Sequence, residues 1–164
     1  GQRMKKALEV TVQAAQWNQT PSEGPGRGVA CCIDFGTIVV EAAEVAILED
    51  EIQVQKVIAV VDPGLVINPD GARAQIEGAI TMGLSSTLFE EVSIIDGVLE
   101  ASNFDRYRIL NMRSAPDIEV HLLESSERPS GMGEPPIGPI AAAVANAVFD
   151  LTGKRLRSLP LRLN

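Results

Sequence analysis

Residues 51–80 read EIQVQKVIAVVDPGLVINPDGARAQIEGAI and join the clearest strand signal in the chain to the clearest helix signal. Apolar and polar residues alternate from Ile52 to Gln55, and after Lys56 all residues are apolar, on both faces, up to Val61. This pattern predicts a strand that is covered on both faces in its second half. Asp62-Pro63-Gly64 then ends the strand, because proline and glycine interrupt regular pairing.

A helix is predicted from Pro69 to about Glu91. Asn68 is a favourable N-cap, and proline suits the first position of a helix. One face of the helix is apolar and consists of Ala72, Ile76, Ala79, Ile80, Leu84 and Leu88. Gly78 and Gly83 each lower helix propensity by about 1 kcal/mol. We therefore expect a neighbouring helix or a ligand to approach the backbone closely at these glycines.

The residues before this unit predict a helix, a loop and two more strands. The strands are Val29–Phe35 and Ile38–Leu48, and a turn at Glu49–Glu51 leads into the strand that ends at Val61. Thr20–Gly28 consists of turn-forming residues and is predicted to be a loop. Met4–Trp17 has helical spacing, with a predicted buried stripe of Met4, Leu8, Val12 and Ala15.

The residues after it complete an α+β pattern. Asp96-Gly97 is the signal of a type I′ hairpin turn, and apolar residues flank it on both sides. Asp117–Leu123 alternates as a strand does, and the alanine-rich run Ile140–Leu151 predicts a helix that ends at Thr152-Gly153. The order of elements predicts an α+β fold with a mostly antiparallel sheet and helices packed against it.

Composition limits the class of protein. The chain has 164 residues, 45% of them hydrophobic, and a net charge of −8. It is long enough to bury a core as one domain, residues 1–164. The acidic balance argues against a nucleic-acid partner, and the apolar runs are too short for a transmembrane segment. Adjacent Cys31 and Cys32 are expected to be free, buried thiols, and the single His121 is expected at the surface or at a sheet edge. No metal site built from side chains is predicted.

The most unusual segment is Ser130-Gly-Met-Gly-Glu-Pro-Pro-Ile-Gly-Pro139. Gly131 and Gly133 lack side chains, so the backbone before Glu134 can approach a ligand closely. The two prolines after Glu134 fix the chain, and the positive end of the next helix lies nearby. A carboxylate held in this way suits a general base. The alternative is a structural turn at the start of the helix, with Glu134 merely solvated.

A second candidate is Gln75 on the predicted helix, because its amide both donates and accepts hydrogen bonds. The alternative is an ordinary surface glutamine. If both candidates serve one site, Gln75 and the segment from Gly131 to Glu134 must converge in space. The mixed segment Asn103–Arg108 could line a pocket or form a salt-bridged loop.

Together these motifs resemble a known family. Gly131-Met-Gly-Glu-Pro-Pro136, Gln75-Ile-Glu-Gly78 and Asp62-Pro-Gly-Leu-Val-Ile-Asn-Pro69 look like the C-terminal part of the molybdenum-binding subunit of the xanthine dehydrogenase/aldehyde oxidase family. The likeness is greatest to the large (beta) subunit of the isoquinoline 1-oxidoreductase or aldehyde dehydrogenase type. Gly26-Arg-Gly-Val-Ala30 and Phe35-Gly-Thr37 also match in order, so the resemblance covers almost the whole chain.

The resemblance implies a role for four residues. Glu134 matches the catalytic glutamate, which takes a proton from the water-derived oxygen that enters the substrate. Gln75 matches a glutamine that hydrogen-bonds the pterin cofactor, while Met132 and Gly133 match backbone positions beside the metal. The implied cofactor is molybdopterin or its cytosine dinucleotide, and the implied substrate is an aldehyde or an N-heterocycle. Electrons would leave through iron–sulfur clusters on a small partner subunit.

The resemblance also implies that the chain is a C-terminal fragment of a much longer molybdopterin-binding subunit, whose remainder would be a further partner. Other cofactor-binding loops of the family lie upstream of Gly1, so the isolated chain is expected to be inactive. The rival hypothesis is a non-catalytic α+β interaction or scaffold domain in which the Gly-Glu-Pro-Pro segment is structural. Molybdenum content distinguishes the two.

Overall fold

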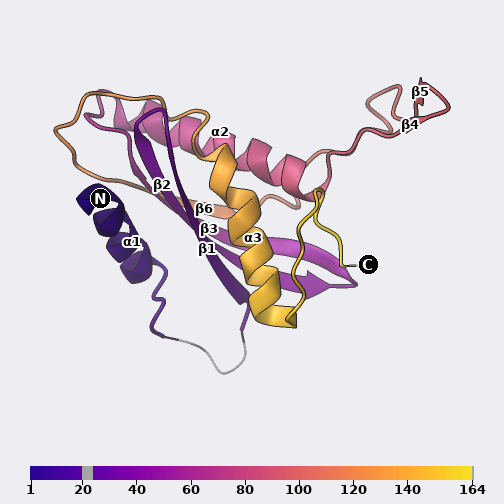
Figure 1. Cartoon of the computed structure of the whole chain (residues 1–164), viewed down its shortest axis with the longest axis horizontal. Helices are drawn as coiled ribbons and strands as arrows, with labels where there is room; N and C mark the ends of the chain where they lie inside the picture. Colours follow the sequence, from indigo (N-terminus) through magenta and orange to yellow (C-terminus); the bar gives the residue numbers. More distant parts are fainter. Residues whose placement is uncertain (20–23, 164) are drawn as a thin grey trace.

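The computed structural model describes residues 1–19 and 24–163 and shows a sheet between two helical layers (Figure 1). The elements, in chain order, are α1 (Gln2–Ala14), β1 (Gly26–Asp34), β2 (Thr37–Leu48), β3 (Glu51–Asp62), α2 (Pro69–Leu88), β4 (Ile94–Ile95), β5 (Val98–Leu99), β6 (Asp117–Leu122) and α3 (Ile137–Thr152). No helix among the described residues is long and apolar enough to cross a membrane.

The main sheet has the order β1-β2-β3-β6. β1, β2 and β3 form two successive antiparallel hairpins, and β6 pairs with β3 in parallel. The predicted α+β class and mostly antiparallel sheet are therefore confirmed. The second half of β3 is covered on both faces as expected, since Val57, Ala59, Val60 and Val61 are all 0% exposed.

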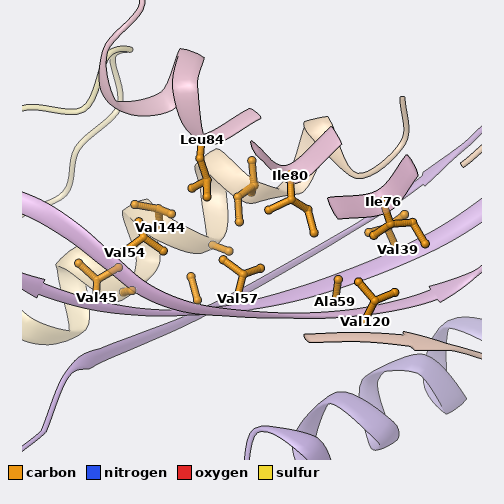
Figure 2. Packing of buried hydrophobic residues seen from close by; sticks show 14 of the residues in the cluster. Val39, Val45, Val54, Val57, Ala59, Ile76, Ile80, Leu84, Val120 and Val144 are labelled. Carbon is orange, nitrogen blue, oxygen red and sulfur yellow. The ribbon is translucent and has the colours of Figure 1, made fainter. Parts of the chain in front are cut away.

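The larger core lies between the sheet and the pair α2 and α3 (Figure 2). α2 begins as predicted, because the Asn68 side chain accepts a hydrogen bond from the Gly71 amide at 3.0 Å. The predicted stripe of α2 is confirmed: its members are buried apart from the half-buried Leu88. Gly83 touches α3 as expected, whereas no described atom lies within 4 Å of where the Cβ of Gly78 would be, so no described helix approaches the backbone there.

α3 lies directly on β1 because β1 has glycines at the contact. A Cβ at Gly28 would fall 2.1 Å from the Ala143 carbonyl oxygen and 2.3 Å from the Ala147 nitrogen. The prediction that residues up to Gly28 form a loop is therefore wrong from Gly26 onward, since the turn-like glycines serve close packing in a strand. Residues 20–23 of that predicted loop lie outside the described part of the chain.

α1 covers the opposite face of the sheet, and the predicted stripe is confirmed at Ala15, which is buried, and at the half-buried Met4, but is wrong for its two middle members. Ala7 and Thr11 are buried, whereas Leu8 and Val12 are 37% and 38% exposed. Small residues let the helix lie close to the strands, and Thr11 satisfies its hydroxyl within the helix by donating to the Ala7 carbonyl at 2.8 Å. Close packing of small residues on the sheet therefore decides which face of α1 is buried, rather than burial of the larger Leu8 and Val12 side chains.

The remaining expectations for the elements are largely confirmed. The hairpin of β4 and β5 turns at Asp96-Gly97, and both residues have positive φ. α3 begins at Ile137, three residues earlier than the predicted Ile140, and ends at Gly153 in the left-handed conformation. Both thiols are free, but Cys31 is exposed, so its expected burial is wrong.

Glu41 is a buried carboxyl in the middle of β2. It is 0% exposed, and neither carboxylate oxygen has a hydrogen-bond partner among the described residues. It pairs with Ala30 on one side and Ala59 on the other, on the sheet face that α2 and α3 cover. Burial raises the pKa of Glu41 well above its usual range. The carboxyl therefore keeps its proton where an exposed glutamate has lost it.

Substitution of Gly28 by alanine is expected to destabilise the domain by about 1–3 kcal/mol, because the new methyl group would overlap the α3 backbone. The matched control is Gly78→Ala, which adds the same methyl group in open space within a helix and should stabilise by about 0.5–1 kcal/mol. Urea unfolding measures both changes. A Gly28→Ala variant as stable as the parent chain would contradict this account of the packing.

Glu41→Gln is expected to remove a pH dependence. Folded Glu41 holds a proton that the unfolded chain releases, so its contribution to stability is full below about pH 4.3 and is lost as the pH rises through the raised folded pKa. In urea unfolding, the variant should gain on the parent by up to about 1.4 kcal/mol per pH unit in this range. Glu49→Gln, in an exposed turn, should run parallel to the parent. If Glu41→Gln also ran parallel, the raised pKa would be wrong.

Candidate functional site

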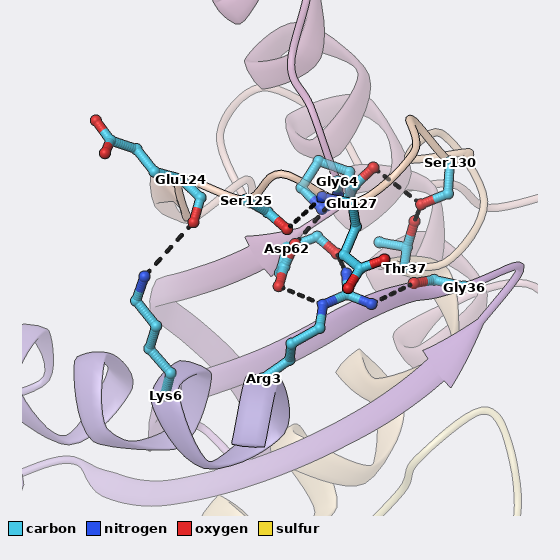
Figure 3. Close-up of polar contacts among 11 residues, drawn as sticks. Arg3, Lys6, Gly36, Thr37, Asp62, Gly64, Glu124, Ser125, Glu127 and Ser130 are labelled. Carbon is cyan, nitrogen blue, oxygen red and sulfur yellow. Dashed lines mark hydrogen bonds and ion pairs between the residues drawn. The ribbon is translucent and has the colours of Figure 1, made fainter. Parts of the chain in front are cut away.

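The candidate site is the loop between β6 and α3, and its central part, residues 130–136, is held by hydrogen bonds from the ends of three strands, β1, β2 and β3. The Ser130 amide donates to the Pro63 carbonyl at 2.8 Å, just after β3. The buried Thr37 hydroxyl, at the start of β2, lies 2.6 Å from the Ser130 hydroxyl (Figure 3). It also donates to the Gly131 carbonyl. Most of these bonds reach the backbone of the loop, so they fix its path.

The loop crosses the end of β3 at very close range. The Leu65 amide donates to the Glu127 carbonyl at 2.9 Å, and a Cβ at Gly64 would fall 2.1 Å from the Arg128 carbonyl oxygen. Gly64 also has a φ of +79°, which favours glycine. Asp62-Pro63-Gly64 therefore both ends the strand and supports the loop.

An ion pair ties α1 to the same support. Arg3 donates from Nε to the Asp62 carboxylate at 2.7 Å, and its Nη1 lies 3.4 Å from the Gly36 carbonyl oxygen (Figure 3). The hydrogen bond from Arg3 lowers the pKa of Asp62, with a further bond from the Gly64 amide. The first turn of α1 thus joins the turn between β1 and β2 to the end of β3.

The far end of the loop rests on β1. The Cys32 thiol donates to the Pro135 carbonyl at 3.5 Å, a normal distance for a bond to sulfur. Burial, with smaller contributions from nearby acidic groups including Glu41, raises the pKa of Cys32 to about 11. The thiol therefore keeps its proton for this bond. Pro135 and Pro136 are buried, and α3 starts immediately after them.

Gln75 and the loop meet, as the hypothesis of one shared site requires. A Cβ at Gly133 would fall 2.6 Å from the Gln75 side-chain oxygen. Gln75 projects from α2 and is exposed, so its amide lies against the backbone of Gly133 and remains accessible. Only glycine at this position leaves room for the glutamine as it stands.

The other predicted site residues differ in how far they are exposed to solvent. Glu134 is exposed at the end of the loop, directly after Gly133. Met132 is half-buried and packs against the large core cluster, so its side chain anchors the loop. Gly131 borders open space, since no described atom lies within 4 Å of where its Cβ would be. The loop thus presents backbone and one carboxylate together.

Two segments noted in the sequence lie apart from this loop. His121 is on the edge strand β6, as expected, and bonds Glu119 at 2.7 Å. Asn103–Arg108 belongs to the connection between α2 and β6, where Arg108 lies 3.7 Å from Glu51. Sequence reasoning missed the supporting roles of Thr37 and Ser130, because nothing local in the sequence reveals a hydrogen bond between such distant residues.

Comparison with known proteins gives consistent results. A family model described as the molybdopterin cofactor-binding domain matches residues 3–116, more than half of the chain. The beta subunit of isoquinoline 1-oxidoreductase from Brevundimonas diminuta is 42% identical over 114 residues, which are 70% of this chain and 15% of that protein. A nicotinate dehydrogenase subunit from Pseudomonas putida is 35% identical over 174 aligned positions, which cover 94% of this chain and 15% of that protein.

A solved structure agrees with the sequence matches. Quinoline 2-oxidoreductase from Pseudomonas putida 86 superposes with a TM-score of 0.71 at 31% identity, covering 76% of this chain and 17% of its own. The chain spans about 15% of the length of the two curated relatives. The match to the family model includes Gln75 and ends before Glu134. The resemblance noted in the sequence is confirmed, and the chain belongs to the molybdopterin cofactor-binding domain family.

Proposed function

We propose that this chain is the part of a molybdenum hydroxylase that supplies the catalytic base, Glu134, and one side of the molybdopterin site. The observation that supports the proposal is the contact between Gln75 and Gly133, which sets a polar amide against bare backbone, one residue before the exposed Glu134. The names of the relatives support the same class, since they include isoquinoline, nicotinate and quinoline oxidoreductases.

The residues present fit a pterin cofactor. The amide of Gln75 can donate to and accept from the polar edge of a pterin ring. Gly131 leaves open space beside the loop that a side chain would fill, Gly133 makes room for the Gln75 amide, and the Met132 side chain anchors the loop on the core. When bound, the cofactor supplies the redox-active metal that takes up the electrons removed from the substrate.

Glu134 would act as the general base. An exposed carboxylate on a loop fixed by backbone bonds is positioned before the substrate arrives, which is the condition for efficient proton transfer. A carboxylate oxygen of Glu134 would take the proton from the water-derived nucleophile as that oxygen attacks the substrate carbon. Gln75 would orient the cofactor and take no part in the proton transfer.

The proposal extends to the whole enzyme. The substrate class is an aldehyde or an N-heterocycle, and the electron-accepting partner is a small subunit with iron–sulfur clusters. The remainder of a molybdopterin-binding subunit would complete the cofactor site, because the chain spans only about 15% of the length of the curated relatives. One 164-residue domain, residues 1–164, would then be a segment of that subunit.

The isolated 164-residue chain is expected to fold and to hold no molybdenum after expression in a host that makes the cofactor. It would supply only one side of the site, and one side of a binding site gives little of the affinity. Circular dichroism checks the fold, and metal analysis of the purified chain checks the content. Stoichiometric molybdenum would contradict the need for the remaining segments.

In a complete subunit with its iron–sulfur partner, Glu134→Gln is expected to lower kcat by about 10²–10⁴-fold at unchanged molybdenum content. The amide keeps the size of the side chain but cannot accept the proton. Gln75→Ala should instead lower molybdenum content first, with a smaller effect on turnover per bound metal. Turnover normalised to molybdenum measures both.

The matched control for Glu134→Gln is Glu124→Gln, an exposed glutamate on the same loop. It should leave both turnover and molybdenum content near the parent values. If Glu134→Gln retained more than about a tenth of the parent activity per metal, against the expected loss, the base would lie elsewhere. A scaffold role would be favoured if neither Glu134→Gln nor Gln75→Ala changed anything.

A further inference from the structure

The connection between α2 and β6 forms an arm, defined as residues 92–112, that projects away from the rest of the domain (Figure 1). No residue of the arm is buried. Apart from Leu110 at its base, which packs against the core, its large aliphatic and phenylalanine side chains are between 51% and 94% exposed: Val92, Ile94, Ile95, Val98, Leu99, Phe104, Ile109 and Met112. Scattered exposed apolar residues are ordinary, but a concentration of this kind marks a surface that is covered in the working protein.

The tip of the arm is apolar on both faces. Ile94 pairs with Leu99 and Ile95 pairs with Val98, in a two-stranded sheet separate from the main one. Neighbouring residues of a strand point to opposite faces, so each face of this hairpin carries one apolar pair. A hairpin of this kind has little stability of its own. Cover on both faces therefore requires a surface that surrounds the tip.

The base of the arm is fixed, so the direction in which it projects is set by the domain. The Arg108 guanidinium stacks on the Phe89 ring at 4.4 Å from its centre. The Tyr107 hydroxyl donates to Glu90 at 2.8 Å, and the Leu110 amide donates to the Ser85 hydroxyl at 3.1 Å. A cleft of about 800 Å³ opens beside the base, between the turn after β2 and the C-terminal residues.

We propose that the arm inserts into the remainder of a molybdenum-binding subunit, which covers both faces of the hairpin. This inference rests on the proposed function, because it takes the chain to work inside such a subunit. The family model includes the arm within residues 3–116, so the arm belongs to the family's domain. About 85% of each curated relative lies outside the matched segment (100% less 15%), which is ample to supply the cover.

A permanent neighbour explains the arm better than a transient one. A partner that binds and leaves would expose the whole apolar hairpin during every unbound interval, and interfaces as apolar as this are typical of obligate contacts. The remainder of the same subunit is always present. A second copy of this chain is the competing occupant, and the experiment below separates the two.

The test is hydrogen exchange of the arm amides, measured by mass spectrometry in the isolated chain and in a complete subunit. The arm should exchange at least about a hundredfold more slowly in the complete subunit, because docking removes its open state. Ile95→Ser together with Val98→Ser should abolish most of this protection, since both side chains would lose their buried contacts. Glu100→Gln, an exposed polar position on the arm, should keep the protection.

The same double variant in the isolated chain serves as the folding control, and its urea unfolding should match that of the parent because both side chains are exposed there. Equal exchange of the arm in the isolated chain and in the complete subunit would overturn the inference. Protection in the isolated chain accompanied by dimerisation in ultracentrifugation would also overturn it, in favour of a second copy.

Molybdenum content of the same samples separates this inference from the proposed function. A complete subunit whose arm is protected but which holds no molybdenum, even after expression with its iron–sulfur partner, would support the docking of the arm and contradict the proposed function. A subunit that holds molybdenum but whose arm is unprotected would contradict only the inference that the arm docks.

Discussion

The direct contact between α3 and β1 is the constraint on which the rest of the structure depends. Gly28 lies so close to the α3 backbone that no other residue fits without displacement. α3 runs antiparallel along β1, so Gly26 lies beside Ala147 near one end of the helix and Cys32 lies beside Pro135 just before the other. The position of the helix start, and of the loop that enters it, therefore follows from the strand.

That loop gains its rigidity from bonds to its backbone. Thr37, Pro63 and Cys32 each bond to the backbone of the loop, from three elements that meet at one end of the sheet. The Glu134 side chain remains exposed. Arg3 stabilises this end of the sheet further, because it bonds both Asp62 at the end of β3 and Gly36 in the turn between β1 and β2. The result is an exposed carboxylate on a segment whose backbone is fixed although it has no regular secondary structure, as is common where loops carry function.

The sequence predicted what depends on local pattern. The apolar run in β3, the cap and stripe of α2 and the Asp96-Gly97 turn were each specified by neighbouring residues. The meeting of Gln75 with the loop was also anticipated, although the roles of both remain proposals. Predictions failed where tertiary contact decided the outcome. On α1, small residues are buried in place of Leu8 and Val12. The glycines of β1 were predicted to form a turn, because the α3 backbone that packs against them lies far along the chain.

The arm also has a consequence for how such domains diversify. Leu110 returns to Ser85, so the chain comes back almost to the point where it left α2. Extra or missing residues between these two points leave the pairing of β6 with β3 and the packing of α3 unchanged, since loops with close ends tolerate changes in length well. Evolution can therefore reshape the outer contacts of the domain by altering one insertion, while the end of the sheet that holds residues 130–136 keeps its geometry.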